Sequence, residues 1–171
     1  DKLQMTFGGR YYNTDEVRVI TTGGLFANGD AGQVNETSSS GFTPRVLAKY
    51  NLNENTTLNA QISQGFRLGG VNDPLNTPVC SAQDLAIFGG YQDYGDETLW
   101  NYEVGFKSNL GNGATLNAAA FYADMEDLQV TLDAGSCSSR ITFNVPEAKS
   151  SGVEIEYRSQ PTDNLELSIA A

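Results

Sequence analysis

The strongest constraint on the fold is a period of two in the hydrophobicity, which recurs in seven separate segments. In one of them, Trp100, Tyr102 and Val104 alternate with Asn101 and Glu103. Such alternation is typical of β-strands with one apolar and one polar face. The segments are residues 2–12, 42–52, 57–67, 100–110, 116–122, 153–158 and 165–169. Most are about 9–11 residues long, the length that a tilted strand needs to cross a bilayer.

The connections between these segments alternate between long and short. The long ones are residues 13–41, 68–98 and 131–150, and the short turns are residues 53–55, 111–113 and 160–164. Outer-membrane barrels have this up-and-down pattern, with long extracellular loops and short periplasmic turns. Within the long connections, we expect residues 17–22 to extend a hairpin above the membrane, residues 33–41 to form a flexible tip, and residues 85–88 to form at most one helical turn.

Charge and composition exclude several classes of function. The net charge is −11, from 10 basic and 21 acidic residues, and a nucleic-acid partner would need a basic surface against phosphate. The chain has no histidine, which excludes His-based triads and imidazole metal sites. Its two cysteines are too few for a cysteine-rich zinc site. The sequence therefore predicts no catalytic group, no metal site and no cofactor.

The seven strands are too few to close a transmembrane barrel, which needs at least about eight. An open sheet would leave unpaired backbone groups in lipid, where each one is costly. The chain also starts at Asp1 without a signal peptide, and residues 165–171 stop within an alternating pattern. We therefore expect a piece of a longer protein, an all-β antiparallel arc of a larger outer-membrane barrel.

Four blocks of sequence carry a family resemblance. Residues 101–108 read NYEVGFKS, residues 116–129 read LNAAAFYADMEDLQ, residues 144–156 read NVPEAKSSGVEIE, and residues 63–72 read SQGFRLGGVN. They resemble barrel strands of the TonB-dependent outer-membrane receptors, which carry patterns such as NYE-x-G-x-K and S-x-G-F-R-P-G-G-x-N, and along the chain they follow the order of that family at compatible spacings. Leu68 departs from the last pattern, which commonly has proline there. The blocks cover roughly residues 42–171, and residues 1–41 match more loosely.

The resemblance implies a barrel of 22 strands in the outer membrane of a Gram-negative bacterium, plugged by an N-terminal domain. It also implies active uptake of a scarce nutrient, such as a ferric siderophore or a similar iron complex, energised through TonB. Residues 1–171 would be part of the barrel domain, without the plug, the TonB-contacting segment and the C-terminal strands. The partners it implies are the plug of the same protein, the TonB complex through the missing N-terminal part, outer-membrane lipid and the nutrient.

Four residues in or next to the second long connection are candidates for ligand binding. Arg67 and Asn72 lie where a strand rises into the loop, and the Arg67 guanidinium could bind an anionic ligand through two parallel hydrogen bonds. Tyr91 and Tyr94 could stack on a ligand or a sugar ring. In the alternative, Arg67 pairs with a carboxylate of the barrel or plug, and the tyrosines pack the loop against its neighbours.

Cys80 and Cys137 fall in two neighbouring long connections, both expected on the extracellular side, where disulfides are stable. A mutual bridge would join residues 57 positions apart and tie the two loops together. Two free thiols, or pairing with a cysteine outside this piece, are the alternatives. The acidic residues of residues 93–97 and 124–127 lack the spacing of a Ca²⁺-binding EF-hand loop, and we expect a solvated acidic surface.

Two other classes of protein fit parts of the pattern. A secreted, soluble antiparallel β module that binds carbohydrate or acts as an adhesin would bury the same apolar rows in its core. A passive porin would lack the plug and would not depend on TonB. The discriminating observation is whether the rows containing Phe7, Ile62 and Val104 are covered by protein or exposed to lipid.

Overall fold

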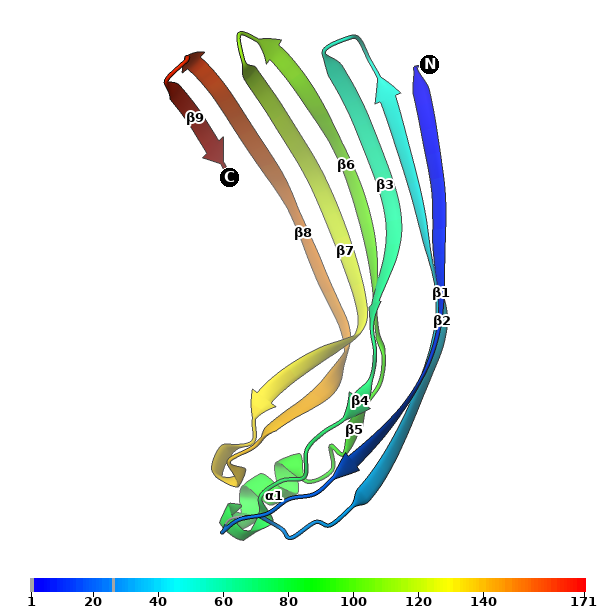
Figure 1. The fold of residues 1–171 in the computed structure, drawn as a ribbon, viewed down its shortest axis with the longest axis vertical. Helices are drawn as coiled ribbons and strands as arrows, with labels where there is room; N and C mark the ends of the chain where they lie inside the picture. Colours follow the sequence, from blue (N-terminus) through cyan, green and yellow to red (C-terminus); the bar gives the residue numbers. More distant parts are fainter. Residues whose placement is uncertain (1, 26) are drawn as a thin grey trace.

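The computed structural model describes residues 2–25 and 27–171, which form one long, curved antiparallel sheet (Figure 1). The sheet has seven strands in the order β1-β2-β3-β6-β7-β8-β9. They are β1 (Leu3–Ile20), β2 (Gln33–Asn51), β3 (Thr56–Arg67), β6 (Glu97–Gly111), β7 (Ala114–Asp133), β8 (Arg140–Thr162) and β9 (Leu165–Ala170). The predicted all-β, up-and-down antiparallel architecture is confirmed, and the sheet is an open arc.

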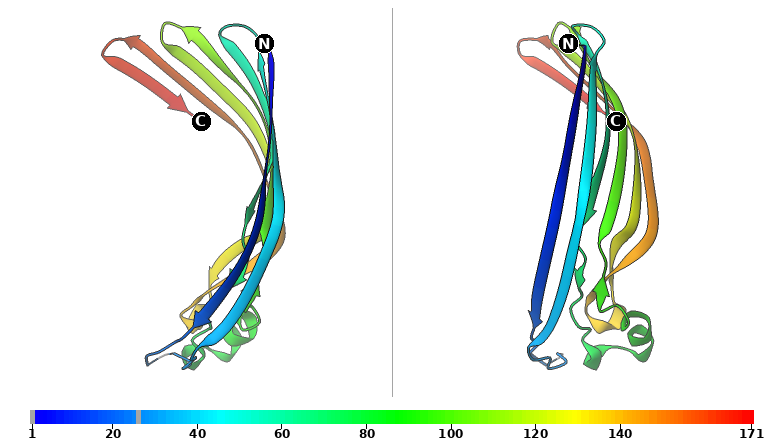
Figure 2. Two further views of the ribbon diagram at one scale, coloured as in Figure 1. Left: turned by 45° about the vertical axis from the view of Figure 1, so that its right-hand side comes forward. Right: turned by 90° about the vertical axis from the view of Figure 1, so that its right-hand side faces the viewer.

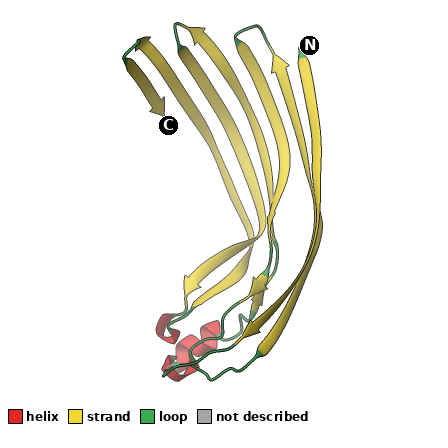
Figure 3. Ribbon diagram, in the orientation of Figure 1, coloured by secondary structure: helices red, strands yellow, loops and turns green. Residues whose placement is uncertain are grey.

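An insertion between β3 and β6 builds much of the loop end, the end of the arc opposite the short turns (Figure 3). It contains β4 (Gly70–Val71), the 3₁₀-helix η1 (Thr77–Val79), the helix α1 (Ala82–Phe88) and β5 (Asp93–Tyr94). A second 3₁₀-helix, η2 (Gly135–Cys137), connects β7 to β8. The expectation of at most one helical turn is wrong, because α1 has seven residues. Its N-cap is Ser81, whose hydroxyl accepts a hydrogen bond from the backbone N–H of Asp84.

The register of the sheet collects the alternating apolar side chains on one side, here called the apolar face. Residues paired directly across adjacent strands share a face, and successive residues point to opposite faces. One row of the apolar face runs through Met5, Ala48, Ala60, Val104, Ala120 and Val153, and the next through Leu3, Tyr50, Leu58, Phe106, Ala118 and Ile155. The other side, the polar face, carries hydrogen bonds from Arg45 to Gln61 (3.0 Å) and from Gln61 to Glu103 (3.4 Å).

Large side chains of the apolar face are exposed rather than covered by protein. Phe7 is 71% exposed, Val104 59% and Val153 65%. A contiguous apolar surface of this extent requires an apolar surrounding such as lipid or a partner. The arrangement does not match a soluble β module, which would bury these rows in its own core. Among the described residues, no helix combines the length and apolarity needed to span a membrane.

Four strands continue far beyond the predicted segments. β1 and β2 pair from Leu3 with Tyr50 to Ile20 with Gln33, and β7 and β8 pair as far as Asp133 with Arg140. The prediction of long loops at residues 13–41 and 131–150, with a flexible tip at residues 33–41, is therefore wrong, although residues 17–20 do extend a hairpin. Backbone pairing needs no apolar side chains, so the ladder of β1 and β2 continues into the polar residues 35–41. In β7 and β8 the alternation itself continues, through Leu128, Val130 and Leu132, beyond the predicted segments.

The arc changes direction on the way to the loop end. The ladder between β7 and β8 is interrupted between the pair Glu126–Glu147 and the pair Leu128–Val145. Asp127 there has a positive φ of 54°, and Pro146 on the facing strand has no backbone N–H to donate. Both strands bend in this region, while β1 and β2 run to the loop end apart from them (Figure 2). The bend brings the ends of β7 and β8 beside the insertion.

A small hydrophobic core lies at the loop end. It consists of Leu75, Ala134, Cys137 and Ile141, which are at most 8% exposed, with Cys80 and Phe88 packed against them. These residues come from the insertion, from η2 and from the start of β8. The core therefore joins the second and third connections into one unit, which we call the cap.

Candidate functional site

The loop end holds all four residues that the sequence nominates for ligand binding, and Asn72 is the most firmly held of them. Its side chain is directed into the fold and is 9% exposed. Its amide nitrogen donates to the carbonyl oxygens of Tyr91 (3.0 Å) and Thr142 (2.7 Å), and its side-chain oxygen accepts from the backbone N–H of Thr142 (2.8 Å). Asn72 thus ties the insertion to β8, and its polar atoms are occupied within the chain.

Arg67 forms an ion pair at the end of β3. One guanidinium nitrogen lies 3.1 Å from the carboxylate of Glu97 and 3.5 Å from the carbonyl oxygen of Gln129. Glu97 is buried, at 7% exposed, and also accepts the backbone N–H of Gln129 (2.8 Å). The Arg67 side chain is still 56% exposed, and both of these contacts are made by the same guanidinium nitrogen.

Sequence reasoning did not identify Gln129 and Asn144, which hold the base of the insertion. The Gln129 amide donates to the carbonyl oxygens of Leu68 (2.9 Å) and Gly95 (3.0 Å). The Asn144 amide donates to the carbonyl oxygen of Gly95 (3.0 Å), and its side-chain oxygen accepts from the Gly95 backbone N–H (2.7 Å). Gln129 and Asn144 stand at the ends of two blocks quoted for the family resemblance, but no local pattern predicts their hydrogen bonds, because the partners lie 17 to 61 positions away.

The acidic run at residues 93–97 is partly buried, so the expectation of a solvated acidic loop is wrong for two of its members. Asp96 accepts the backbone N–H of Gly69 (2.6 Å) and the hydroxyl of Ser39, and Glu97 pairs with Arg67 as described above. Gly69 must be glycine here, since a Cβ would lie 2.5 Å from the carbonyl oxygen of Tyr94. Among the described residues, no three acidic or cysteine side chains are grouped so as to hold a metal ion.

Tyr91 and Tyr94 occupy different places in the loop end. Tyr91 is 43% exposed and its ring lies 5.4 Å from the ring of Phe143, tilted by 40°. Tyr94 is half-buried in β5, where its ring covers Gly70, so that a Cβ at Gly70 would meet the phenol oxygen at 2.8 Å. Both tyrosines pack against the protein, and Tyr91 keeps an exposed part for other contacts.

A disulfide joins Cys80 to Cys137, as the sequence predicts, and links the insertion to η2. A hydrogen-bonded cluster lies beside it. Asp84 accepts the backbone N–H of Ser136 (2.9 Å) and the Ser136 hydroxyl, and that hydroxyl accepts the backbone N–H of Ser81 (2.7 Å). The hydrogen bonds from Ser136, with a smaller one from Ser81, lower the pKa of the Asp84 carboxyl because they stabilise its charged form.

Two cavities open at the loop end. The first, of about 440 Å³, lies between the first connection and the cap, and both Asn72 and Tyr91 line it together with polar residues such as Asn28, Asp30 and Gln92. The second, of about 540 Å³, lies between β1, β2 and the β4–β5 hairpin and is lined in part by Tyr94 and Asp96. Arg67 lines neither cavity. The four nominated residues are therefore close in the fold but do not form a single pocket.

The charge of the chain is concentrated at this end. Residues 13–41, 67–98 and 124–149 contain 14 of the 21 acidic residues but only 4 of the 10 basic ones. They therefore carry almost all of the net charge of −11. A surface of this sign attracts cations and repels anions over about a Debye length of 8–10 Å at physiological salt.

Comparisons with known proteins agree with this geometry. A family model described as "TonB dependent receptor-like, beta-barrel" matches residues 1–171. The chain is 28% identical over 145 residues to the iron-regulated outer membrane virulence protein of Vibrio cholerae, which covers 75% of this chain and 21% of that protein. The chain thus spans about a fifth of the length of the curated relatives it matches.

Solved structures show the same fold. The ferric yersiniabactin uptake receptor FyuA of Yersinia pestis superposes with a TM-score of 0.69 at 19% identity, over 99% of this chain and 23% of that one. The copper transporter OprC gives a TM-score of 0.66 at 16% identity, over 99% and 26% of the two chains. The FrpB iron transporter of Neisseria meningitidis gives 0.61 at 18% identity, over 99% and 23%.

Proposed function

The chain belongs to the TonB-dependent receptor-like β-barrel family of the bacterial outer membrane, and from this premise we propose that it is an arc of an active transporter for a scarce nutrient. The nutrient we propose is a ferric siderophore or a similar iron complex, and the energy comes through TonB. The names of the relatives support this proposal, since three of them refer to iron. Members of the family are transport receptors, not enzymes.

The observation that carries the proposal is the division of the sheet into two zones. One zone exposes an apolar face along its whole width, as a wall in lipid does. The other extends the strands into a polar cap with two cavities. A wall in the membrane that continues into a structured cap is suited to capture a ligand outside and to guide it into a pore.

Within the cap, we assign the ligand contacts to the exposed part of Tyr91 and to Tyr94, each of which lines a cavity. Arg67 is proposed to contact an anionic group with the donors that Glu97 leaves free, since its side chain is 56% exposed. We propose that Asn72 supports ligand binding by positioning Tyr91. Its side-chain amide donates to the carbonyl oxygens of Tyr91 and Thr142 and so fixes the loop that carries Tyr91.

The polar face of β1 and β2 supports the proposal of a plug inside a larger, 22-stranded barrel. Arg10, Arg45 and Lys49 lie on this face, and in the described part of the chain none of them forms an ion pair with a carboxylate. Arg10 instead lies over the ring of Phe66, 5.4 Å from its centroid. Unpaired cations on the inside of the arc fit acidic groups of the proposed N-terminal plug.

Uptake by the full-length receptor tests the proposal. We expect a strain that lacks its own siderophore receptors to accumulate radioactive iron from ferric siderophores when it produces this receptor, and to stop doing so when TonB is deleted. Replacing both Tyr91 and Tyr94 by Ala should weaken ligand binding at an unchanged level of folded receptor. Uptake that continues without TonB would indicate a passive porin and would overturn the proposal, as would failure to transport any iron complex.

A further inference from the structure

Each of the four basic residues in the loop-end segments, residues 13–41, 67–98 and 124–149, already forms an ion pair. The pairs are Arg18–Asp73, Arg67–Glu97, Arg140–Asp133 and Lys149–Glu147. The same segments contain 14 acidic residues. Ten carboxylates there are therefore left without a cationic partner among the described residues. A ligand that reaches the loop end meets negative charge that the chain itself does not balance.

The side chains that line the two cavities of the loop end have the same bias. Asp30 and Asp73 line the first cavity, and Glu16, Asp93 and Asp96 line the second. In the described part of the chain, no lysine or arginine lines either cavity. Glu16 and Asp93 are exposed and form no ion pair with any described residue. The second cavity therefore presents two unpaired carboxylates to a ligand.

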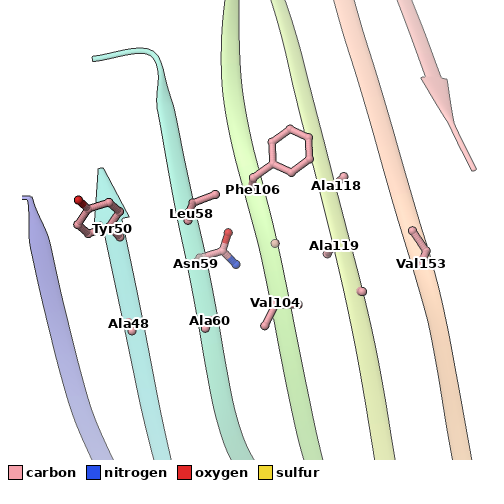
Figure 4. Close-up of a pocket in the computed structure, with 12 residues that line it drawn as sticks. Ala48, Tyr50, Leu58, Asn59, Ala60, Val104, Phe106, Ala118, Ala119 and Val153 are labelled. Atoms are coloured by element: carbon pink, nitrogen blue, oxygen red, sulfur yellow. The ribbon is translucent and has the colours of Figure 1, made fainter. Parts of the chain in front are cut away.

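Other cavities of the chain differ in charge, so the acidic lining is particular to the loop end. Arg10 and Arg45 line a cavity of about 490 Å³ on the polar face, between β1, β2 and β3. A shallow hollow of about 520 Å³ across β2, β3, β6, β7 and β8 has no charged side chain in its lining (Figure 4). The chain thus surrounds one cavity with basic side chains, but not the two cavities to which we assign ligand capture.

A tyrosine accompanies the carboxylates in each of the two cavities. Tyr91 lines the first and Tyr94 the second. The faces of tyrosine rings attract ammonium and guanidinium groups, and carboxylates attract the same groups by charge. Arg67 can still donate to an oxygen atom of a ligand, but its positive charge is balanced by Glu97. The recognition groups at this end therefore favour a cation over an anion.

We propose that the receptor selects ferric complexes without net negative charge, and prefers those that carry a protonated amine. Ferric trihydroxamates with a free amine belong to this class, whereas ferric tricatecholates carry several negative charges and do not. The unbalanced carboxylates repel an anionic complex over about 8–10 Å at physiological salt and attract a cationic one. This inference rests on the proposed function and narrows the class of iron complex that the cap captures.

The test compares ferric complexes that differ in a single terminal group, bound to the full-length receptor in detergent. The first chelator is a linear trihydroxamate with a free amine, the second has that amine acetylated, and the third has it succinylated. Their ferric complexes carry one positive charge, no net charge and one negative charge at neutral pH, while the coordination of iron is the same. A ferric tricatecholate is the fourth ligand, and calorimetry measures each affinity at low and at physiological salt.

Two double variants locate the source of the preference. Glu16→Gln with Asp93→Asn removes the two unpaired carboxylates of the second cavity. The matched control, Glu54→Gln with Asp163→Asn, removes two negative charges from the short turns at the other end of the arc (Figure 1). All four side chains are exposed, so both variants should fold, and heat-modifiable gel mobility checks that they do.

In wild type and control, we expect the amine complex to bind about fivefold more tightly than the acetylated one, and the succinylated one to bind most weakly of the three. The preference should fall to about twofold or less in the Glu16 and Asp93 variant, and should shrink as salt is added. Equal affinities, tighter binding of the succinylated complex or the tricatecholate, or an unchanged preference in that variant would overturn the inference while iron-complex binding stands. If no ferric complex of any charge binds, the proposed function itself fails and the inference fails with it.

Discussion

At the scale of single residues, the loop end depends on polar side chains whose hydrogen bonds are made within the chain. Glu97 is the clearest case, because its carboxylate is buried and satisfies both the Arg67 guanidinium and the Gln129 backbone N–H. A buried polar group without a partner is costly. The geometry of the cap therefore depends on carboxylate and amide groups as well as on the small hydrophobic core.

Replacing Glu97 by Ala should loosen the insertion. The change leaves the Gln129 N–H without its acceptor and Arg67 without its counter-charge, at a cost of about 1–3 kcal/mol. Hydrogen exchange of the full-length receptor should then show faster exchange in residues 68–96. Asp93→Ala is the control, because Asp93 is exposed. Unchanged protection in the Glu97 variant would show that its hydrogen bonds do not hold the insertion.

Acid should open the cap through Asp84. Hydrogen bonds from Ser136 lower the pKa of this carboxyl in the folded protein, so the charged form contributes stability above the ordinary carboxyl pKa of about 4. That contribution is lost as the pH falls below this value and through the lowered pKa. Proteolysis of the cap by pepsin should accelerate over this range in wild type. Asp84→Asn should be cleaved with a weaker dependence on pH, and an identical dependence would contradict the assignment.

At the scale of elements, the alternating pattern of the sequence predicts the strands well within the apolar zone and poorly outside it. Residues such as Met5, Val46 and Ile62 reveal their face because a one-residue slip would move them to the polar side. The extension of β2 at residues 35–41 has no such signal, because its residues are nearly all polar or small. The extension of β7 does alternate, through Leu128, Val130 and Leu132, but part of it falls within the predicted long loop at residues 131–150. Gln129 and Asn144 could not be found either, because their partners are distant in sequence and a single sequence does not reveal such pairs.

The disulfide is the covalent link between the insertion, at Cys80 between η1 and α1, and η2, which are otherwise joined by the small core and the Asp84 cluster. Replacing Cys80 and Cys137 by Ser should destabilise the cap by about 2–4 kcal/mol if the chain-entropy model holds, and by less where the strands already restrain the loops. Limited proteolysis with and without reductant should show cleavage at residues 75–90 in the variant and in reduced wild type. If both the variant and the reduced wild type resist cleavage, the small core and the hydrogen bonds hold the cap together without the disulfide.

At the scale of the whole molecule, the arc has two free edges, β1 and β9, and an exposed apolar face. Unpaired edges are not tolerated in lipid and promote association in water. Residues 1–171 produced alone should therefore aggregate in buffer, as measured by light scattering, whereas the full-length receptor in detergent should remain monodisperse. A soluble monomer with a cooperative thermal transition would mean that the apolar face is covered by the chain itself.

The extended strands also have a mechanical consequence. β8 has 23 residues and β7 has 20, about twice the length needed to cross a bilayer. Their hydrogen bonds run perpendicular to the strands. A pull along the strands loads many of these bonds in shear at once, whereas a sideways pull breaks them one after another. The cap is thus carried by strands that resist a pull along their length better than a sideways pull that separates them.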